Sequence, residues 1–264
     1  MQMEKNMRIL LIRHGDPDYE HDSLTPEGVK EAKALAETAD ILKPGTCFVS
    51  PLGRARRTAS YTLEKLGITA EVRDWLQEFP ARVDIAKNPE ELLKAYPDTE
   101  FENGRPKPHI VWDMVPAYRM SHPELMDFED WKKSELMKYS DAAGLYDSVT
   151  GSFNELLREH GCSFNGTNWV VEKESEETLT FFCHFGLACV LMSWLFRVSP
   201  FVLWHQVILQ PSSVTEIRTE EREQGIAQFR ASRIGDISHL VLAGLDPSFA
   251  GRFCETYSNT EQRH

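Results

Sequence analysis

The amino-acid sequence predicts an α/β fold, namely a three-layer sandwich with a mostly parallel central sheet, helices on both faces and a helical cap insertion. Apolar runs of strand length alternate with segments whose apolar residues recur at helical spacing. A proline-rich, aromatic stretch interrupts this alternation between residues 80 and 150. We therefore expect a single domain over residues 1–264, with residues 80–150 as the cap.

The first strand and the first helix have clear boundaries. Residues 8–13 form a nearly continuous apolar run, which is typical of a strand buried on both faces of a parallel sheet. Thr25, Pro26 and Glu27 are a cap, a first-position proline and a first-turn acid, so a helix is expected to begin there. Pro44 and Gly45 end this region.

The remaining core elements follow in the same way. We predict a strand at residues 47–50 and a helix at 54–66 that Gly67 closes. A helix is expected through residues 153–157, strands at 169–171 and 178–183, and another helix from Gly186. Residues 214–219 and 226–231 flank a charged turn with a glycine, which predicts a hairpin at the sheet edge.

The stretch from residue 80 to residue 150 is predicted to be a helical cap. Short helices are expected to begin at Asn88 and His122, each of which precedes a proline. The stretch is rich in Trp and Tyr, whose large apolar rings need burial, so we favour a cap over a disordered linker. An independent second domain of this size is the less favoured alternative.

Composition excludes several classes of function. The chain has 29 Lys and Arg against 41 Asp and Glu, a formal net charge of −12, so no broad basic surface for nucleic acid or anionic lipid is expected. Its five cysteines form no Cys-x-x-Cys pair, so we expect reduced thiols and no metal site.

The sequence favours a cytoplasmic protein without a membrane span. The apolar run at residues 9–12 is too short for the core of a signal peptide. Residues 179–196 reach the minimum length of a spanning helix, but Thr180, His184 and Gly186 divide them into a strand, a turn and a helix.

Three predicted strand ends carry polar residues suited to an anionic ligand. Arg13 and His14 end the first strand, Arg54 follows the second, and His184 ends a later one. Since the carboxyl ends of parallel strands meet at one edge of a sheet, we expect these side chains to lie together. Taken singly, each has an ordinary alternative as a solvent-exposed or core residue. Arg56 and Arg57 are assigned to the solvated helix face.

These residues together resemble the histidine phosphatase superfamily, also called phosphoglycerate mutase-like. The resemblance lies in four motifs in order: Leu11-Ile12-Arg13-His14-Gly15; Leu24-Thr25-Pro26-Glu27-Gly28, followed by Ala32 and Leu35-Ala36; Ser50-Pro51-Leu52-Gly53-Arg54-Ala55 with Thr58-Ala59; and His184 with Gly186. It covers the predicted core but not residues 80–150, and four ordered motifs are far more specific than one.

The resemblance implies a role for each of these residues. His14 would be the nucleophile that accepts a phosphoryl group, and Arg13, Arg54 and His184 would form the phosphate pocket, with His184 also taking part in catalysis. Glu78, in Leu76-Gln77-Glu78, is the expected general acid. Competing acids are Glu71, Asp74 and, from the cap, Asp113. The implied chemistry needs no metal and no cofactor.

Departures from the family pattern bear on the reaction. Phe185 stands where close relatives often carry glycine, which is expected to narrow the pocket. Asp16-Pro17-Asp18-Tyr19 replaces the continuation found in the phosphoglycerate mutase branch, so a phosphatase is favoured over a mutase. As a hypothesis, the cap would form the substrate lid, with wall residues Trp112, Tyr118, Arg82 and Arg119. Equally, these residues could be the cap's own core.

The sequence thus favours a metal-independent phosphomonoester hydrolase that acts on a small phosphorylated metabolite through a phosphohistidine. A mutase-type phosphotransferase, a non-catalytic phosphate-binding module and a phosphoprotein phosphatase are the alternatives. The substrate itself and the oligomeric state are not indicated by the sequence.

Overall fold

The structure, a computed structural model, describes residues 6–249. The chain divides into two compact units. The first comprises Met1–Glu78, Phe153–Ala188 and Val207–His264, and the second comprises Phe79–Ser152 and Cys189–Gln206. The second unit therefore contains the predicted insertion together with a later segment of the chain.

The first unit alternates strands and helices, as predicted. Its elements are β1 (Arg8–Arg13), β2 (Pro17–Asp18), β3 (Ser23–Leu24), α1 (Pro26–Glu37), α2 (Ala39–Leu42), β4 (Thr46–Val49), α3 (Gly53–Leu66), β5 (Ala70–Val72), η1 (Asp74–Leu76), β10 (Cys162–Phe164), β11 (Trp169–Val171), β12 (Thr178–Cys183), β13 (Val214–Glu223), β14 (Ile226–Asp236) and α9 (Ser238–Leu242). Helices α6 (Ala142–Glu159) and α7 (Phe185–Phe196) each run through both units.

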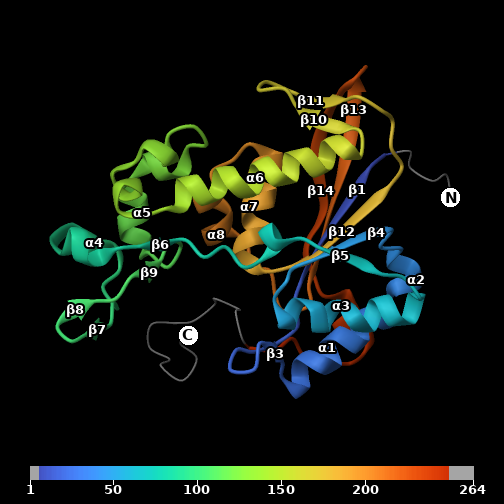
Figure 1. The fold of residues 1–264 in the computed structure, drawn as a ribbon, viewed down its shortest axis with the longest axis horizontal. Coiled ribbons are helices and arrows are strands. Elements are labelled where there is room, and N and C mark those ends of the chain that lie inside the picture. Colours follow the sequence, from blue (N-terminus) through green and yellow to red (C-terminus); the bar gives the residue numbers. More distant parts are fainter. Residues whose placement is uncertain (1–5, 250–264) are drawn as a thin grey trace. The chain divides into compact units, whose positions relative to one another are not determined.

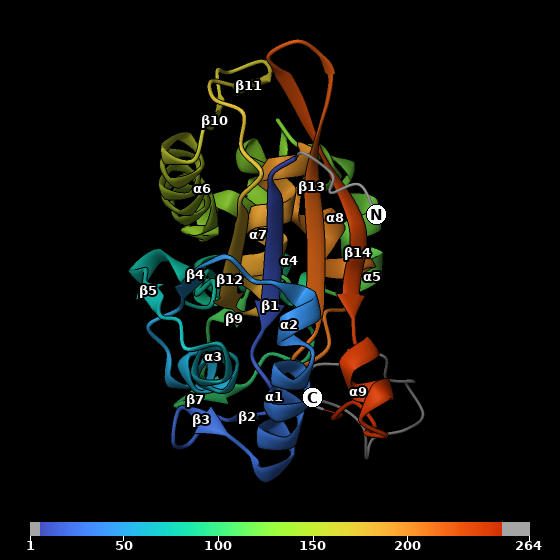
Figure 2. The ribbon, with the colours of Figure 1, turned by 90° about the vertical axis from the view of Figure 1, so that its right-hand side faces the viewer.

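Within residues 6–249, eight strands pair into one sheet in the order β10-β11-β14-β13-β1-β12-β4-β5. β1, β12, β4 and β5 pair in parallel, and the pairs from β1 through β13, β14 and β11 to β10 are antiparallel. Figure 2 shows β12, β1, β13 and β14 side by side. The half of the sheet formed by β1, β12, β4 and β5 matches the parallel arrangement that the sequence predicted.

The β13–β14 hairpin corrects one prediction. The hairpin exists, but it does not lie at the sheet edge, because β13 pairs with β1 and β14 pairs with β11. The position of the hairpin within the sheet depends on its pairing with β1 and β11, which are distant from it in sequence. The short β10–β11 hairpin occupies that end of the sheet instead.

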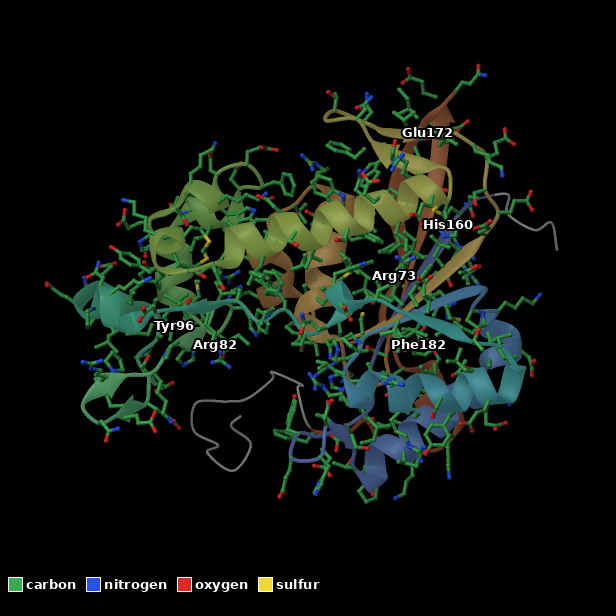
Figure 3. The ribbon with its side chains drawn as sticks, in the orientation of Figure 1. Arg73, Arg82, Tyr96, His160, Glu172 and Phe182 are labelled. Atoms are coloured by element: carbon green, nitrogen blue, oxygen red, sulfur yellow. The ribbon has the colours of Figure 1, made fainter. Side chains whose placement is uncertain are left out.

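Helices cover both faces of the sheet, because alternate strand residues point to opposite sides. Phe182 of β12 belongs to a buried cluster with Leu35 of α1 and Ala59 of α3. The preceding residue, Phe181, packs against Phe153 of α6, with ring centroids 5.6 Å apart. Figure 1 shows α1 and α3 lying together, and Figure 3 labels Phe182. The three-layer α/β fold is confirmed.

Local signals set the predicted helix ends. The Thr25 side chain accepts a hydrogen bond from the Gly28 N–H and caps α1. Gly67 ends α3 with a φ of 63°, a left-handed conformation that suits glycine.

Four cysteines, Cys47, Cys162, Cys183 and Cys189, are free and buried; Cys254 lies outside the described residues. In the described part of the chain, no helix is both long enough and apolar enough to cross a membrane.

The second unit is built from short elements around an aromatic core. They are β6 (Arg82–Val83), η2 (Ile85–Lys87), α4 (Pro89–Ala95), β7 (Phe101–Glu102), β8 (Arg105–Pro106), β9 (His109–Ile110), α5 (Pro116–Ser121), η3 (Pro123–Met126), η4 (Trp131–Lys133), η5 (Glu135–Tyr139) and α8 (Pro200–Gln206). Trp112 packs against Trp204 at 5.3 Å between ring centroids, and Trp131 against Tyr146 at 5.1 Å. The predicted short helices at Asn88-Pro89 and His122-Pro123 are present.

The four residues named as possible lid walls lie in this second unit. Trp112 and Tyr118 are buried, and Tyr118 stacks on His122. Arg119 is buried too. Arg82, labelled in Figure 3, lines a hollow of about 460 Å³ together with Lys87 and Tyr139. Burial of the rings agrees with a core role, and the lid itself stays a prediction.

Candidate active site

The structure brings the predicted strand-end residues of the first unit together. Arg13 ends β1, His14 follows it, and His184 separates β12 from α7. The His14 and His184 rings have centroids 5.1 Å apart and are tilted by 57°. Arg54, in the first turn of α3, and Arg13 are close enough for their charges to lower the pKa of both imidazoles.

Strand register and a glycine contact place His14. Arg13 lies opposite Cys183 in the parallel β1–β12 pair, so His14 and His184 leave the sheet at the same level. The His14 N–H donates to the Cys183 carbonyl at 3.0 Å. A Cβ on Gly15 would come within 2.7 Å of the Gly28 carbonyl oxygen, so only glycine fits after His14.

The hydrogen bond of His14 determines which ring nitrogen can react. Its Nδ1 lies 2.7 Å from the Gly15 carbonyl oxygen, which can only accept, so Nδ1 carries the hydrogen. Nε2 consequently holds a lone pair. Burial, and secondarily the charge of Arg13, lower the pKa of His14 well below its usual 6.5. The imidazole is therefore neutral near pH 7, as a nitrogen nucleophile must be.

His184 is completely buried and is held by Ser50, which follows β4. The distance between its Nε2 and the Ser50 Oγ is 2.8 Å. Among residues 6–249, its Nδ1 has no hydrogen-bond partner. Burial first, and then the neighbouring His14, lower the pKa of His184 well below 6.5. With Nδ1 protonated, this ring could donate to a phosphoryl oxygen while Nε2 accepts from Ser50.

The two arginines are held by different contacts. Arg13 is 5% exposed, and its Nη1 donates to the Leu209 carbonyl oxygen. Its guanidinium carbon lies 5.8 Å from the centre of the Phe185 ring. Phe185, the departure from the family pattern, thus contacts a guanidinium of the candidate pocket. Arg54 instead forms an ion pair with Asp22, at 2.9 Å.

Glu78 lies beside the same strand end. Its Oε1 accepts from the Leu187 N–H in the first turn of α7 at 3.1 Å. Burial, and secondarily the charge of Glu78, raise the pKa of Cys183. The competitors differ: Glu71 is exposed and pairs with Arg73, labelled in Figure 3, whereas Asp113 lies in the second unit near His109. Asp74 is an exposed residue that begins η1.

Sequence reasoning missed several residues that hold this site. Asp22 pairs with Arg54, Ser50 with His184, and the Thr58 Oγ1 accepts from the Gly15 N–H at 2.9 Å. Ser50 and Thr58 both belong to the third quoted motif, so that motif was the available signal. Over residues 6–249, no group of three or more His, Cys, Asp or Glu side chains is arranged to hold a metal ion.

Comparison with known proteins gives one family match. The model of the histidine phosphatase superfamily (branch 1) matches residues 9–112, a span that includes Arg13, His14, Arg54 and Glu78 but not His184. Among curated proteins, no sequence matches this chain.

Solved structures extend the likeness to most of the chain. A phosphoserine phosphatase mutant from Entamoeba histolytica, in complex with phosphoserine, is 15% identical with a TM-score of 0.55, covering 89% of this chain and 99% of that one. A mycobacterial glucosyl-3-phosphoglycerate phosphatase is 18% identical with a TM-score of 0.50, covering 86% and 98%. At such identities the likeness is one of fold. The resemblance indicated by the motifs is confirmed: over residues 9–112 this chain carries the sequence pattern of the histidine phosphatase superfamily, on the fold of these phosphatases.

Proposed function

We propose that the protein is a phosphomonoester hydrolase that works without a metal through a phosphohistidine on His14. The observation that carries this proposal is the state of His14: buried, neutral and hydrogen-bonded through Nδ1, it offers Nε2 as a nucleophile beside two guanidinium groups. The imidazole of His184 lies beside that of His14, with the two ring centroids 5.1 Å apart.

The proposed reaction has two steps. In the first, Nε2 of His14 attacks phosphorus, the bond from phosphorus to the ester oxygen breaks, and Glu78 gives its proton to the leaving alkoxide. In the second, Glu78 takes a proton from water, whose oxygen attacks phosphorus and breaks the P–N bond to release inorganic phosphate. Arg13, Arg54 and His184 would hold the equatorial oxygens, where negative charge spreads in both transition states.

A small phosphorylated metabolite is the proposed substrate. The similar structures are named as phosphatases of phosphoserine and of glucosyl-3-phosphoglycerate, so these two compounds belong in a first substrate panel. A mutase would deliver the phosphoryl group to a second hydroxyl instead of water. A non-catalytic phosphate-binding module would retain the pocket without turnover.

The test is hydrolysis of p-nitrophenyl phosphate with EDTA present, from pH 4 to pH 8. We expect turnover by the wild type and its loss in His14→Ala, while His160→Ala, which removes a histidine at the other end of the sheet paired with Glu177, keeps wild-type activity. Glu78→Gln should lower kcat by about 100-fold or more because it removes the base that activates water in the second step.

Other outcomes would select the alternatives. Turnover that survives in His14→Ala, or that EDTA abolishes, would refute the proposed mechanism. Phosphate binding without hydrolysis would favour the binding module, and transfer of the phosphoryl group to an added alcohol in preference to water would favour the mutase.

A further inference from the structure

Asp22 joins the start of α3 to the guanidinium of Arg54. Its Oδ1 accepts from Arg54 Nη1 at 2.9 Å, and its Oδ2 accepts from the Gly53 N–H at 2.6 Å. Gly53 and Arg54 are the first two residues of α3. The Asp22 carboxylate thus binds both the backbone N–H of Gly53 at the start of the helix and the side chain of Arg54.

The backbone around Asp22 is closely constrained. A Cβ on Gly53 would lie 2.0 Å from the Asp22 carbonyl oxygen, so this approach requires glycine at position 53. Asp22 itself has a φ of 43°, a left-handed conformation that is unfavourable for residues other than glycine, although Asp tolerates it better than most. Such local strain persists where the surrounding structure enforces it, and it is common at functional sites.

Asp22 holds the Arg54 guanidinium but does not occupy all of its hydrogen-bond donors. Its side chain is only 11% exposed, and its Nε has no hydrogen-bond partner within the described part of the chain. Its charge is felt by both His14 and His184, which places it at the candidate pocket. Asp22 therefore occupies one edge of the guanidinium and leaves a buried donor for another acceptor.

We propose that Asp22 is a positioning residue, which holds the Arg54 guanidinium at the orientation that binds the phosphoryl group. This inference rests on the proposed function of the same site. The competing interpretation is that Asp22 acts as an internal anion that weakens phosphate binding. We favour positioning because the Asp22 side chain is 47% exposed, so water screens its repulsion, whereas a charge-assisted bond from Arg54 to phosphate depends on geometry.

The Asp22→Asn variant tests this proposal. Asn has the same shape but replaces one carboxylate oxygen with an NH₂ group, so in the same orientation it loses one of the two oxygens that accept from Gly53 and Arg54. Calorimetry with inorganic phosphate should show binding weakened by about tenfold, and p-nitrophenyl phosphate should show a raised KM and a lowered kcat. The matched control is Glu20→Gln, which removes the same charge from an exposed residue of the same loop and should change neither.

A double-mutant cycle identifies the partner. If Asp22 acts through Arg54, Asp22→Asn should weaken phosphate binding no further in an Arg54→Ala background. Additive losses would overturn the proposal. Tighter phosphate binding in Asp22→Asn would establish the competing anion, and unchanged binding would also refute positioning.

A further variant separates geometry from charge and from misfolding. Asp22→Glu keeps the negative charge but lengthens the side chain by one methylene, so positioning predicts weak phosphate binding in a protein with a wild-type circular dichroism spectrum. Wild-type phosphate binding in Asp22→Glu would contradict it. Phosphate binding needs no turnover, so a wild type that binds phosphate without hydrolysing esters refutes the hydrolase alone. A wild type that binds no phosphate refutes both.

Discussion

Ser50 holds His184, and its Oγ also accepts from the Leu52 N–H at 3.2 Å. Removing its hydroxyl in Ser50→Ala would leave the buried Nε2 of His184 without that partner. We expect a loss of about 1–3 kcal/mol of unfolding free energy and a kcat lowered by about tenfold. Urea unfolding and p-nitrophenyl phosphate kinetics measure the two effects.

The matched control is Ser60→Ala in α3, whose hydroxyl donates to the Arg57 carbonyl oxygen near the surface. It should change stability by less than about 0.5 kcal/mol. If Ser50→Ala matched this control in both measurements, the contact between Ser50 and His184 would have no functional weight.

The residues that the sequence could predict at the site are those at strand ends. Arg13, His14, Arg54 and His184 meet because parallel strands bring their carboxyl ends to one edge. The residues that hold them were not predictable in this way. Asp22 and Arg54 are 32 positions apart, and Ser50 and His184 are 134 apart, so only the folded chain shows that they touch.

At the scale of elements, Gly28 of helix α1 packs closely against the loop that follows His14. A Cβ at this position would come within 2.2 Å of the Asp16 carbonyl oxygen, so Gly28→Ala must shift the backbone next to Gly15. We expect a loss of about 1–3 kcal/mol in unfolding free energy together with a lower kcat. Urea unfolding and steady-state kinetics test both.

Gly151 in α6 is the matched control, because it is exposed and a Cβ there meets no atom within 4 Å. Gly151→Ala should stabilise the protein by about 0.5–1 kcal/mol, since alanine has the higher helix propensity. Equal effects of the two substitutions on stability would show that the contact between Gly28 and Asp16 is not restrictive.

Elements with local signals were predicted well, and those that depend on distant pairing were not. The capped helix α1, the glycine-ended helix α3 and the apolar strands β1 and β12 carry their boundaries in their own residues. The β13–β14 hairpin was placed at the sheet edge because its sequence shows only that the two strands pair with each other. Which strands flank them is decided by β1 and β11, far away in the chain.

At the scale of the whole molecule, the two units differ in what the sequence could predict. The first holds Arg13, His14, Arg54, Glu78 and His184, and its motifs indicated both fold and chemistry. The second builds its core from aromatic pairs such as Trp112 with Trp204, which signal burial but not pairing. Substrate preference, which such a unit could set, is therefore not predictable from these motifs.

Buried histidines should also make the stability of the folded chain depend on pH. Burial lowers the pKa of His14 and of His184 below 6.5, and that of His239 to about 4. The unfolded chain therefore binds more protons than the folded one as the pH falls below 6.5, and folding stability decreases with acidification. For His239 the loss between pH 6.5 and pH 4 is at most about 3 kcal/mol.

His239→Gln isolates one part of this dependence. His239 lies 2.9 Å from the Ser212 Oγ, and the Ser212 N–H donates to the His14 carbonyl oxygen, so glutamine can keep a hydrogen-bonding partner there without titrating. Urea unfolding should show the variant less stable than the wild type at pH 7, with the difference shrinking by about 2 kcal/mol by pH 5. A difference that stays constant between these pH values would show that His239 does not titrate differently in the folded and unfolded states.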